Sequence, residues 1–243
     1  SEYLLIKSYH KFMTDAIIVI QARMGSSRFP GKMNHKFFGI PLFELILKRL
    51  KPLNDLGAKI VLATSSKEIE IPLVNIAKKH EIEVFRGDEY NVFSRFILVA
   101  DHYKEKKIFI RICGDNPFVD PLLIQELYSF HISNSDLDYS WNHAPRSTYY
   151  WPDGFGAECF TRSALKRADK LVLSKEELEH VTLCFYTRNV FVSGSYYPDN
   201  KFKSNIKFDI DKPNQIVYLE KIIKKYNIFW DDSSNTIIQK VNK

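Results

Sequence analysis

The chain has 243 residues, of which 45% are hydrophobic and 26% are charged, and its formal net charge is +6. These values suit one globular unit with a sizeable core and exclude a wholly disordered chain. The sequence has no apolar run of roughly 18 residues and no export signal, and its three cysteines lack the spacing of a disulfide framework or a Cys-rich zinc site. We therefore expect a cytoplasmic protein without a membrane partner.

The positive net charge favours an anionic partner but does not identify it. Nucleic acid, a membrane surface and a phosphate-rich small molecule all carry the required charge. Three cations gather in one glycine-containing loop, whereas no basic helix or aromatic-interleaved stripe is visible. We therefore expect no nucleic-acid partner, and a polyanion-binding module remains the alternative from a different functional class.

Apolar runs alternate with segments of helical spacing from residue 16 onward, after an irregular extension over residues 1–15. The pattern predicts strands and helices in turn over residues 16–20, 42–50, 59–63, 68–80, 83–85, 92–103, 107–112 and 121–131. Such alternation with short loops predicts an α/β domain over residues 16–243, with a Rossmann-like, mostly parallel sheet and helices on both faces. Ligands of these folds bind beyond the carboxyl ends of the strands.

The alternation breaks after about residue 135. The pattern predicts strand-like pieces within 141–160 and 190–197, a helix over 163–188, a strand over 206–210 and a helix over 213–226. We interpret residues 135–200 as an inserted lobe packed on the sheet. Such a lobe would cover the site or pair with another subunit.

The loop over residues 21–32 follows the first predicted strand and reads Gln-Ala-Arg-Met-Gly-Ser-Ser-Arg-Phe-Pro-Gly-Lys. Glycine lets backbone N–H groups approach a phosphate, and Arg23, Arg28 and Lys32 offset its charge. The loop is not a Walker A motif, because Met33 follows Lys32 where Ser or Thr would bind magnesium. It also lacks the GxGxxG pattern of dinucleotide-binding proteins. We interpret it as a phosphate-binding loop.

Two aspartates follow predicted strands at the same sheet edge. Asp115 lies after the strand 107–112, and Asp211 directly follows the strand 206–210. Carboxylates in such loops hold hard cations, so together with the cationic loop they predict a magnesium–polyphosphate site. A turn-forming role for Asp115 and a helix-capping role for Asp211 remain open. Asp120, beside Pro121, is expected to cap the helix that follows it.

Three polar residues of the expected lobe are candidates for contact with a hydroxyl-rich substrate: Asp153, Glu158 and His180. Glu176 and Glu177 precede His180 at helical spacing, but the pattern is not HExxH, so a zinc site is disfavoured. A purely structural histidine is the alternative for His180.

Residues 20–32 resemble the nucleotide loop of the sugar-acid cytidylyltransferases, in particular their spore coat polysaccharide biosynthesis branch, which is related to the acylneuraminate and 3-deoxy-manno-octulosonate enzymes. Similar segments recur in the same order over residues 61–66, 85–95, 111–121, 152–158, 179–182 and 211–213. Cys113 departs from this resemblance, because relatives commonly carry a hydroxyl or amide residue there. Asn116 and Lys212 also differ from the usual neighbours of the two aspartates.

The resemblance implies a role for each candidate site residue. CTP would contact Gln21, Ala22, Arg23, Gly25, Ser26, Arg28, Lys32 and Thr64, the last near the base. Mg²⁺ would be held by Asp115 and Asp211, which together with Arg23 and Lys32 form the expected catalytic set. The acceptor would contact Asn116, Asp153, Glu158 and His180.

The expected reaction is magnesium-dependent transfer of CMP from CTP to a sugar acid with release of pyrophosphate, in surface polysaccharide or glycan synthesis. The resemblance also implies a homodimer. A different NTP, a phosphorylated or non-sugar acceptor, and an inactive nucleotide-binding relative remain open alternatives.

Overall fold

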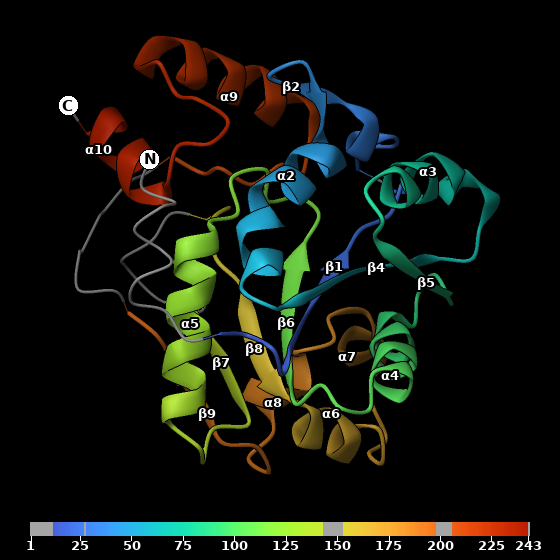
Figure 1. Ribbon diagram of the computed structural model, residues 1–243. Coiled ribbons are helices and arrows are strands. Elements are labelled where there is room, and N and C mark those ends of the chain that lie inside the picture. Colours follow the sequence, from blue (N-terminus) through green and yellow to red (C-terminus); the bar gives the residue numbers. More distant parts are fainter. Residues whose placement is uncertain (1–11, 27, 143–152, 198–205, 243) are drawn as a thin grey trace.

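The computed structural model describes residues 12–26, 28–142, 153–197 and 206–242. Seven strands form one sheet in the order β5-β4-β1-β6-β8-β7-β9. Its parallel part, visible in Figure 1, confirms the predicted strands and consists of β1 (Ala16–Gln21), β4 (Lys59–Ser65), β5 (Glu83–Gly87) and β6 (Ile108–Cys113). β1, β4 and β6 are largely apolar and buried because both of their faces are covered, whereas the edge strand β5 is only partly buried.

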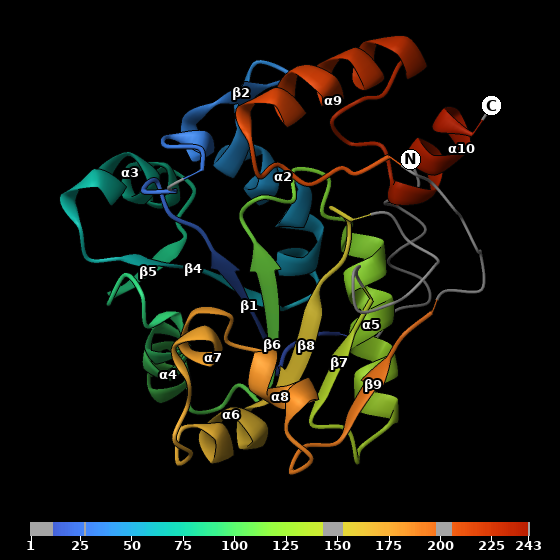
Figure 2. The ribbon, with the colours of Figure 1, turned by 180° about the vertical axis from the view of Figure 1, so that it is seen from behind.

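Helices cover both faces of the sheet, as predicted (Figures 1 and 2). The first face is packed by α2 (Leu42–Asp55), α3 (Ile71–Lys79) and α5 (Pro121–Ser133), and the second by α4 (Val92–His102). Alternation along β1 divides the core accordingly. Ile18 and Ile20 belong to the first cluster of buried residues, and Ile17 and Val19 belong to the second.

The described part of residues 135–200 continues the central sheet. Strands β8 (Glu158–Thr161), β7 (Tyr139–Trp141) and β9 (Ser193–Ser195) add its second half, and β8 runs antiparallel to β6. We expected these residues to pack on the sheet as a lobe, but backbone pairing makes them part of it. Residues 143–152 of this region lie outside the described residues.

The helical stretch expected over 163–188 is not continuous. Three short helices occupy this stretch: α6 (Arg162–Ala168), α7 (Lys175–Glu179) and α8 (Leu183–Thr187). Ser174 starts α7 with a capping box, which favours a new helix start over a continued one. Val181 then adopts a positive φ of 25°, which interrupts the helical path.

The strand expected over 206–210 is also wrong, although the helix after it is confirmed as α9 (Pro213–Tyr226). The backbone N–H groups of Phe208 and Ile210 donate to the carbonyl oxygens of Asp153 and Asp115, at 2.9 and 2.8 Å. These bonds go to loops rather than to a neighbouring strand, so no ladder forms. The segment instead crosses the end of the sheet.

Several short elements were not expected from the sequence. They are η1 (Lys32–Asn34), β2 (Lys36–Phe37), β3 (Ile40–Pro41) and α10 (Ser234–Val241). The helix expected over 68–80 is present as the short 3-10 helix η2 (Glu68–Glu70) followed by α3. Of the expected extension 1–15, only the last residues are described, and Met13 among them is fully buried. Within the described ranges, no helix is both long enough and apolar enough to cross a membrane.

Candidate active site

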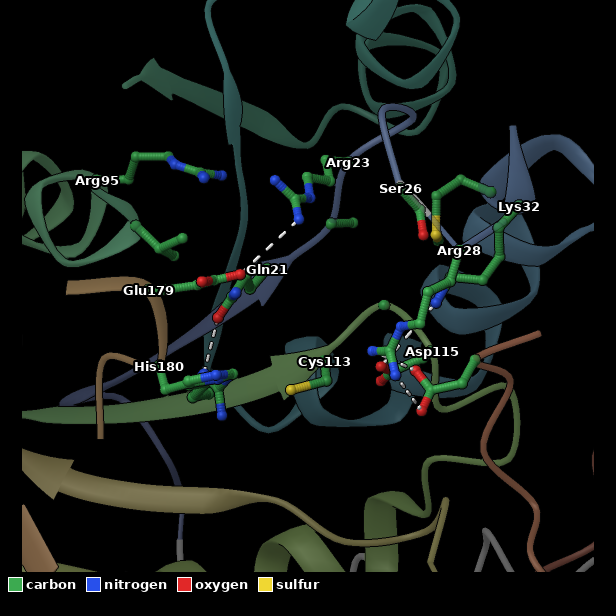
Figure 3. Close-up of a pocket in the computed structure, with 16 residues that line it drawn as sticks. Gln21, Arg23, Ser26, Arg28, Lys32, Arg95, Cys113, Asp115, Glu179 and His180 are labelled. Carbon is green, nitrogen blue, oxygen red and sulfur yellow. Dashed lines mark hydrogen bonds and ion pairs between the residues drawn. The ribbon is translucent and has the colours of Figure 1, made fainter. Parts of the chain in front are cut away.

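A cavity of about 250 Å³ lies where β1 and β6 end, the position predicted from the sheet topology (Figure 3). Most of its lining comes from the loops that follow these two strands and from the turn after α7. The residues that line it are Gln21, Ala22, Arg23, Ser26, Arg28, Lys32, Met33, Val92, Arg95, Arg111, Cys113, Gly114, Asp115, Glu179, His180 and Asp211.

The predicted phosphate-binding loop is held by a buried carboxylate from η2. Glu70 is 1% exposed and accepts hydrogen bonds from the Met24 backbone N–H at 2.7 Å and from the Ser65 hydroxyl at 3.0 Å. On the other side, Gly114 lets the loop after β6 approach closely, since a Cβ at this position would lie 2.8 Å from that of Ala22. Both contacts fix the loop against the end of the sheet.

The two predicted aspartates meet at one end of the cavity. The Ile210 N–H donates to the Asp115 carbonyl oxygen at 2.8 Å, which brings the residue after Ile210 next to Asp115. Lys32 Nζ donates to the Ile210 carbonyl at 2.7 Å and lies 4.0 Å from Asp115 Oδ2. Arg28 Nη2 lies 3.1 Å from Asp211 Oδ1. Each carboxylate therefore faces a cation of the predicted loop, as Figure 3 shows for Arg28, Lys32 and Asp115.

Asp211 is not the cap of α9, so the capping alternative is wrong. Lys212 occupies the N-cap position, and the Gln215 side chain accepts from the backbone N–H groups of Asp211 and Lys212. The Asp211 carboxylate is left to face the cavity. Asp120, in contrast, caps α5 as expected, because its side chain accepts from Leu122 N–H at 2.8 Å.

The donor set at this end fits a magnesium ion that arrives with substrate phosphates. The side chains of Asp115 and Asp211 are each 34% exposed and supply hard oxygen ligands. Asp209 lies behind them; burial raises its pKa, Lys207 lowers it, and the neighbouring Asp115 and Asp211 carboxylates raise it again. Among the described residues no group of three or more His, Cys, Asp or Glu side chains could hold a metal alone. Phosphate oxygens and water would complete the coordination.

Arginines mark the opposite end of the cavity, toward α4. Arg23 Nη2 lies 3.9 Å from Glu179 Oε1, and Figure 3 shows Arg95 pointing toward Arg23 from α4. Arg95 is 1% exposed and donates to the carbonyl oxygens of Ala63 at 3.3 Å and Glu89 at 2.9 Å. Burial lowers the pKa of Arg95, and the nearby charge of Arg23 lowers it further. Arg23 thus lies in a different ion pair from those of Arg28 and Lys32.

The cavity floor contains a buried ion pair. Arg111, on β6, donates through Nε to Gln21 Oε1 at 2.8 Å and through Nη1 to Glu158 on β8. Glu158 also accepts from the Tyr139 hydroxyl at 2.6 Å and from Thr182 Oγ1 at 2.7 Å. Glu158 is therefore close to the cavity but separated from it by Arg111.

Nine of the fourteen residues predicted to contact the nucleotide, the metal or the acceptor line the cavity: Gln21, Ala22, Arg23, Ser26, Arg28, Lys32, Asp115, His180 and Asp211. Gly25 belongs to the loop but faces Glu89, whose Oε1 would lie 3.5 Å from a Cβ there.

Thr64, Asn116 and Asp153 lie outside the lining. Thr64 is fully buried on β4, and its hydroxyl has no hydrogen-bond partner among the described residues. Asn116 is 7% exposed and forms a turn through its N–H, which donates to the Cys113 carbonyl at 3.2 Å. The Asp153 carbonyl accepts from Phe208 N–H. The Asn116 and Asp153 bonds support the loops around the two aspartates.

Three charged residues of the lining had no predicted role: Arg95, Arg111 and Glu179. Two of them could have been recognised in the sequence as charged residues within apolar segments. Arg111 interrupts the apolar run Lys-Ile-Phe-Ile-Arg-Ile, and Arg95 interrupts the apolar helix 92–103. A charged residue within a buried element requires a partner or a function, and here it borders the cavity.

Comparison with known proteins identifies the family of this chain. The family model described as cytidylyltransferase matches residues 17–237, nearly the whole chain. The chain belongs to the cytidylyltransferase family. It is therefore a nucleotidyltransferase by family, which confirms the class of enzyme expected from the resemblance.

Relatives of this cytidylyltransferase span most of its length. Spore coat polysaccharide biosynthesis protein SpsF of Bacillus subtilis (strain 168) is 34% identical over 182 residues, which cover 73% of this chain and 71% of that protein. An uncharacterized protein of Methanocaldococcus jannaschii is 32% identical over 205 residues, 83% of this chain and 81% of its own.

Solved structures share the fold of this cytidylyltransferase. A cytidylyltransferase from Leptospira borgpetersenii superposes with a TM-score of 0.83 at 26% identity and covers 94% of each chain. The CMP:2-keto-3-deoxy-manno-octonic acid synthetase complexed with CTP superposes with a TM-score of 0.65 at 16% identity, over 86% of this chain and 98% of that one. The second likeness shows the fold alone.

Proposed function

We propose that this chain transfers CMP from CTP to a hydroxyl oxygen of a sugar acid and releases pyrophosphate. The observation that carries the proposal is the meeting of Asp115 and Asp211 beside Arg28 and Lys32 in one cavity. Paired carboxylates next to cations suit a metal–triphosphate complex. The family supports a cytidine nucleotide, and relatives include 3-deoxy-manno-octulosonate cytidylyltransferases.

The triphosphate would lie over the aspartate end of the cavity. Ser26, Arg28 and Lys32 line this end, and the loop that carries them is held in place by Glu70. When the acceptor oxygen attacks the α-phosphorus, the bond to the β,γ-diphosphate breaks and negative charge moves onto the leaving pyrophosphate. Arg28 and Lys32 would stabilise that charge, so most of the catalysis is positioning and electrostatics.

Asp115 and Asp211 would hold Mg²⁺, which when bound neutralises phosphate charge and orients the α-phosphate. Both carboxylates are paired with cations in the structure, so binding of the metal and the phosphates requires an exchange of partners. Arg28, whose side chain is 62% exposed, can leave Asp211 for a phosphate oxygen without losing buried contacts. The acceptor would enter from the side of His180, and its hydroxyl proton would pass to solvent.

The nucleotide is tested by thermal shift with CTP, UTP, ATP and GTP, each with magnesium. CTP should raise the midpoint of unfolding most, because a ligand of the native state stabilises it by mass action. The reaction is tested by pyrophosphate release from CTP with a panel of sugar acids. Stabilisation by another NTP, or turnover only with a phosphorylated sugar, would replace this proposal by the corresponding alternative. CTP binding without turnover for every acceptor would indicate an inactive relative.

A further inference from the structure

The Arg111–Glu158 pair is the most deeply buried ion pair among the described residues. The side chain of Arg111 is 7% exposed and that of Glu158 is 2% exposed, whereas every other described ion pair has a partner that is more open. Burying two charges costs desolvation energy that an apolar pair of similar volume would avoid. The pair borders the cavity through Arg111, so a functional reason for keeping it is available there.

Glu158 is committed to protein donors. Its carboxylate accepts from Arg111, from the Tyr139 hydroxyl and from the Thr182 hydroxyl. Because these donors come from three separate elements and Glu158 does not line the cavity, the carboxylate cannot turn toward a substrate without breaking all three hydrogen bonds. Its effect on the cavity is therefore to hold the Arg111 guanidinium in one place.

Arg111 retains donors for a ligand. A guanidinium has five N–H groups, and among the described residues Gln21 and Glu158 each take one. Arg111 lies between Glu158 and the cavity, with its planar group clamped by both neighbours. A pre-oriented guanidinium of this kind suits the planar, bidentate recognition of a carboxylate.

Arg111 lies on the side of the cavity where we expect the acceptor to bind. Its supporting residue Thr182 lies two positions after His180, which lines the same cavity, and Cys113 lies two positions after Arg111 along β6. The cations assigned to the phosphates, Arg28 and Lys32, pair instead with the two aspartates. An anionic group at Arg111 is thus a different group from the triphosphate.

We infer that Arg111 binds the carboxylate of the sugar-acid acceptor, with Glu158 and Thr182 as positioning residues. The inference rests on the proposed function and deepens it, because it assigns the acid group of the acceptor to a named side chain. It also accounts for the buried pair, since a neutral residue at position 111 would fill the space without recognising an acid.

The test compares binding of an acid with binding of its methyl ester. Wild type, Arg111→Lys and Arg111→Gln are titrated calorimetrically, in the presence of CDP and magnesium, with 3-deoxy-manno-octulosonate and N-acetylneuraminate and with their methyl esters. Wild type should bind at least one acid roughly 10- to 100-fold more tightly than its ester, the effect of one charge-assisted pair. Both variants should lose most of this difference between the acid and its ester.

Thr182 supplies a matched pair of variants that leaves Arg111 intact. Thr182→Val removes one donor to Glu158 and should raise the KM for the acid with little change in the KM for CTP, and Thr182→Ser should restore it. If Arg111→Gln does not fold, Arg111→Lys and the Thr182 pair still decide the question. A rise in the KM for CTP alone, or equal binding of acid and ester by wild type, would overturn the inference.

The outcomes separate the inference from the proposed function. Release of pyrophosphate only with acceptors that lack a carboxylate would leave CMP transfer standing and overturn the role of Arg111. Carboxylate-dependent binding without pyrophosphate release for any acceptor would leave the role of Arg111 standing and overturn the transfer reaction.

Discussion

Ile210 donates its backbone N–H to the carbonyl oxygen of Asp115 at 2.8 Å, and this bond joins two loops that are far apart in the sequence. It aligns the segment before α9 with the loop after β6, so that Asp211 follows directly beside Asp115. Lys32 reinforces the junction by donating to the Ile210 carbonyl at 2.7 Å. In the structure, these two hydrogen bonds hold the loops of the two aspartates side by side.

Removal of divalent cations should stop the reaction without unfolding the protein. Asp115 and Asp211 are each paired with a cation of the chain, and the described residues contain no metal cluster that could act as a structural site. Excess EDTA should abolish pyrophosphate release and shift the midpoint of thermal unfolding by less than about 1 °C, well below the effect of losing 1 kcal/mol. Added Mg²⁺ should restore turnover. A drop of many degrees would reveal a structural ion.

Glu70→Ala should weaken both stability and nucleotide binding. The change leaves the buried Met24 N–H and Ser65 hydroxyl without an acceptor, which should cost about 2 kcal/mol or more of unfolding free energy. The loosened loop should also raise the KM for CTP. Chemical denaturation and steady-state kinetics measure the two effects. Glu68→Ala, an exposed change in the same short helix, is the control and should alter neither.

Gly154→Ala should be strongly destabilising because of a close backbone approach. A Cβ at Gly154, where φ is +111°, would lie 2.5 Å from the Phe208 carbonyl carbon. We expect a loss of about 3 kcal/mol or more, together with displacement of the segment that carries Asp211. Gly39→Ala is the matched control: φ is +75° but nothing lies within 4 Å, so the loss should be about 1 kcal/mol. Equal losses would refute the clash.

Acid should weaken the structure beside the cavity through Glu177. The hydrogen bonds that Arg188 donates lower the pKa of Glu177 to about 2. Because the pKa is depressed in the folded state, the stabilisation is complete above about pH 4.5 and is lost as the pH falls toward 2. Glu177→Gln should cost about 1–2 kcal/mol at neutral pH and flatten the pH dependence of unfolding in that window. An unchanged pH profile in the variant would contradict this assignment.

Much of the fold and the aspartate end of the site could be predicted from the sequence. The buried runs and the helical spacing up to residue 131 are local patterns, and they locate the loops after β1 and β6 correctly. The helix expected over 163–188 failed because Ser174 and Val181 interrupt it, and the strand expected over 206–210 failed because its partners are loops. Both errors concern long-range or capping contacts that periodicity does not contain.

The ion pair at the floor of the cavity could not be predicted either, because it also depends on a long-range contact. We expected Glu158 to contact the acceptor. In the structure its carboxylate accepts a hydrogen bond from Arg111, which lies on a strand distant in sequence. Arg111 lies within β6 and Glu158 is the first residue of β8, but their pairing depends on the antiparallel register of the two strands, where Arg111 lies opposite Glu158. That register is a property of the folded sheet.

The most direct test of the central claim is mass analysis of the product formed from CTP, magnesium and a sugar acid by wild type, Asp115→Asn and Asp211→Asn. Wild type should yield the CMP-linked acid and pyrophosphate, and each variant should be slower by a factor on the order of 10² to 10³. Asp101→Asn, an exposed aspartate paired with Lys166, is the matched control and should retain full activity. Undiminished product formation by either active-site variant would contradict the account.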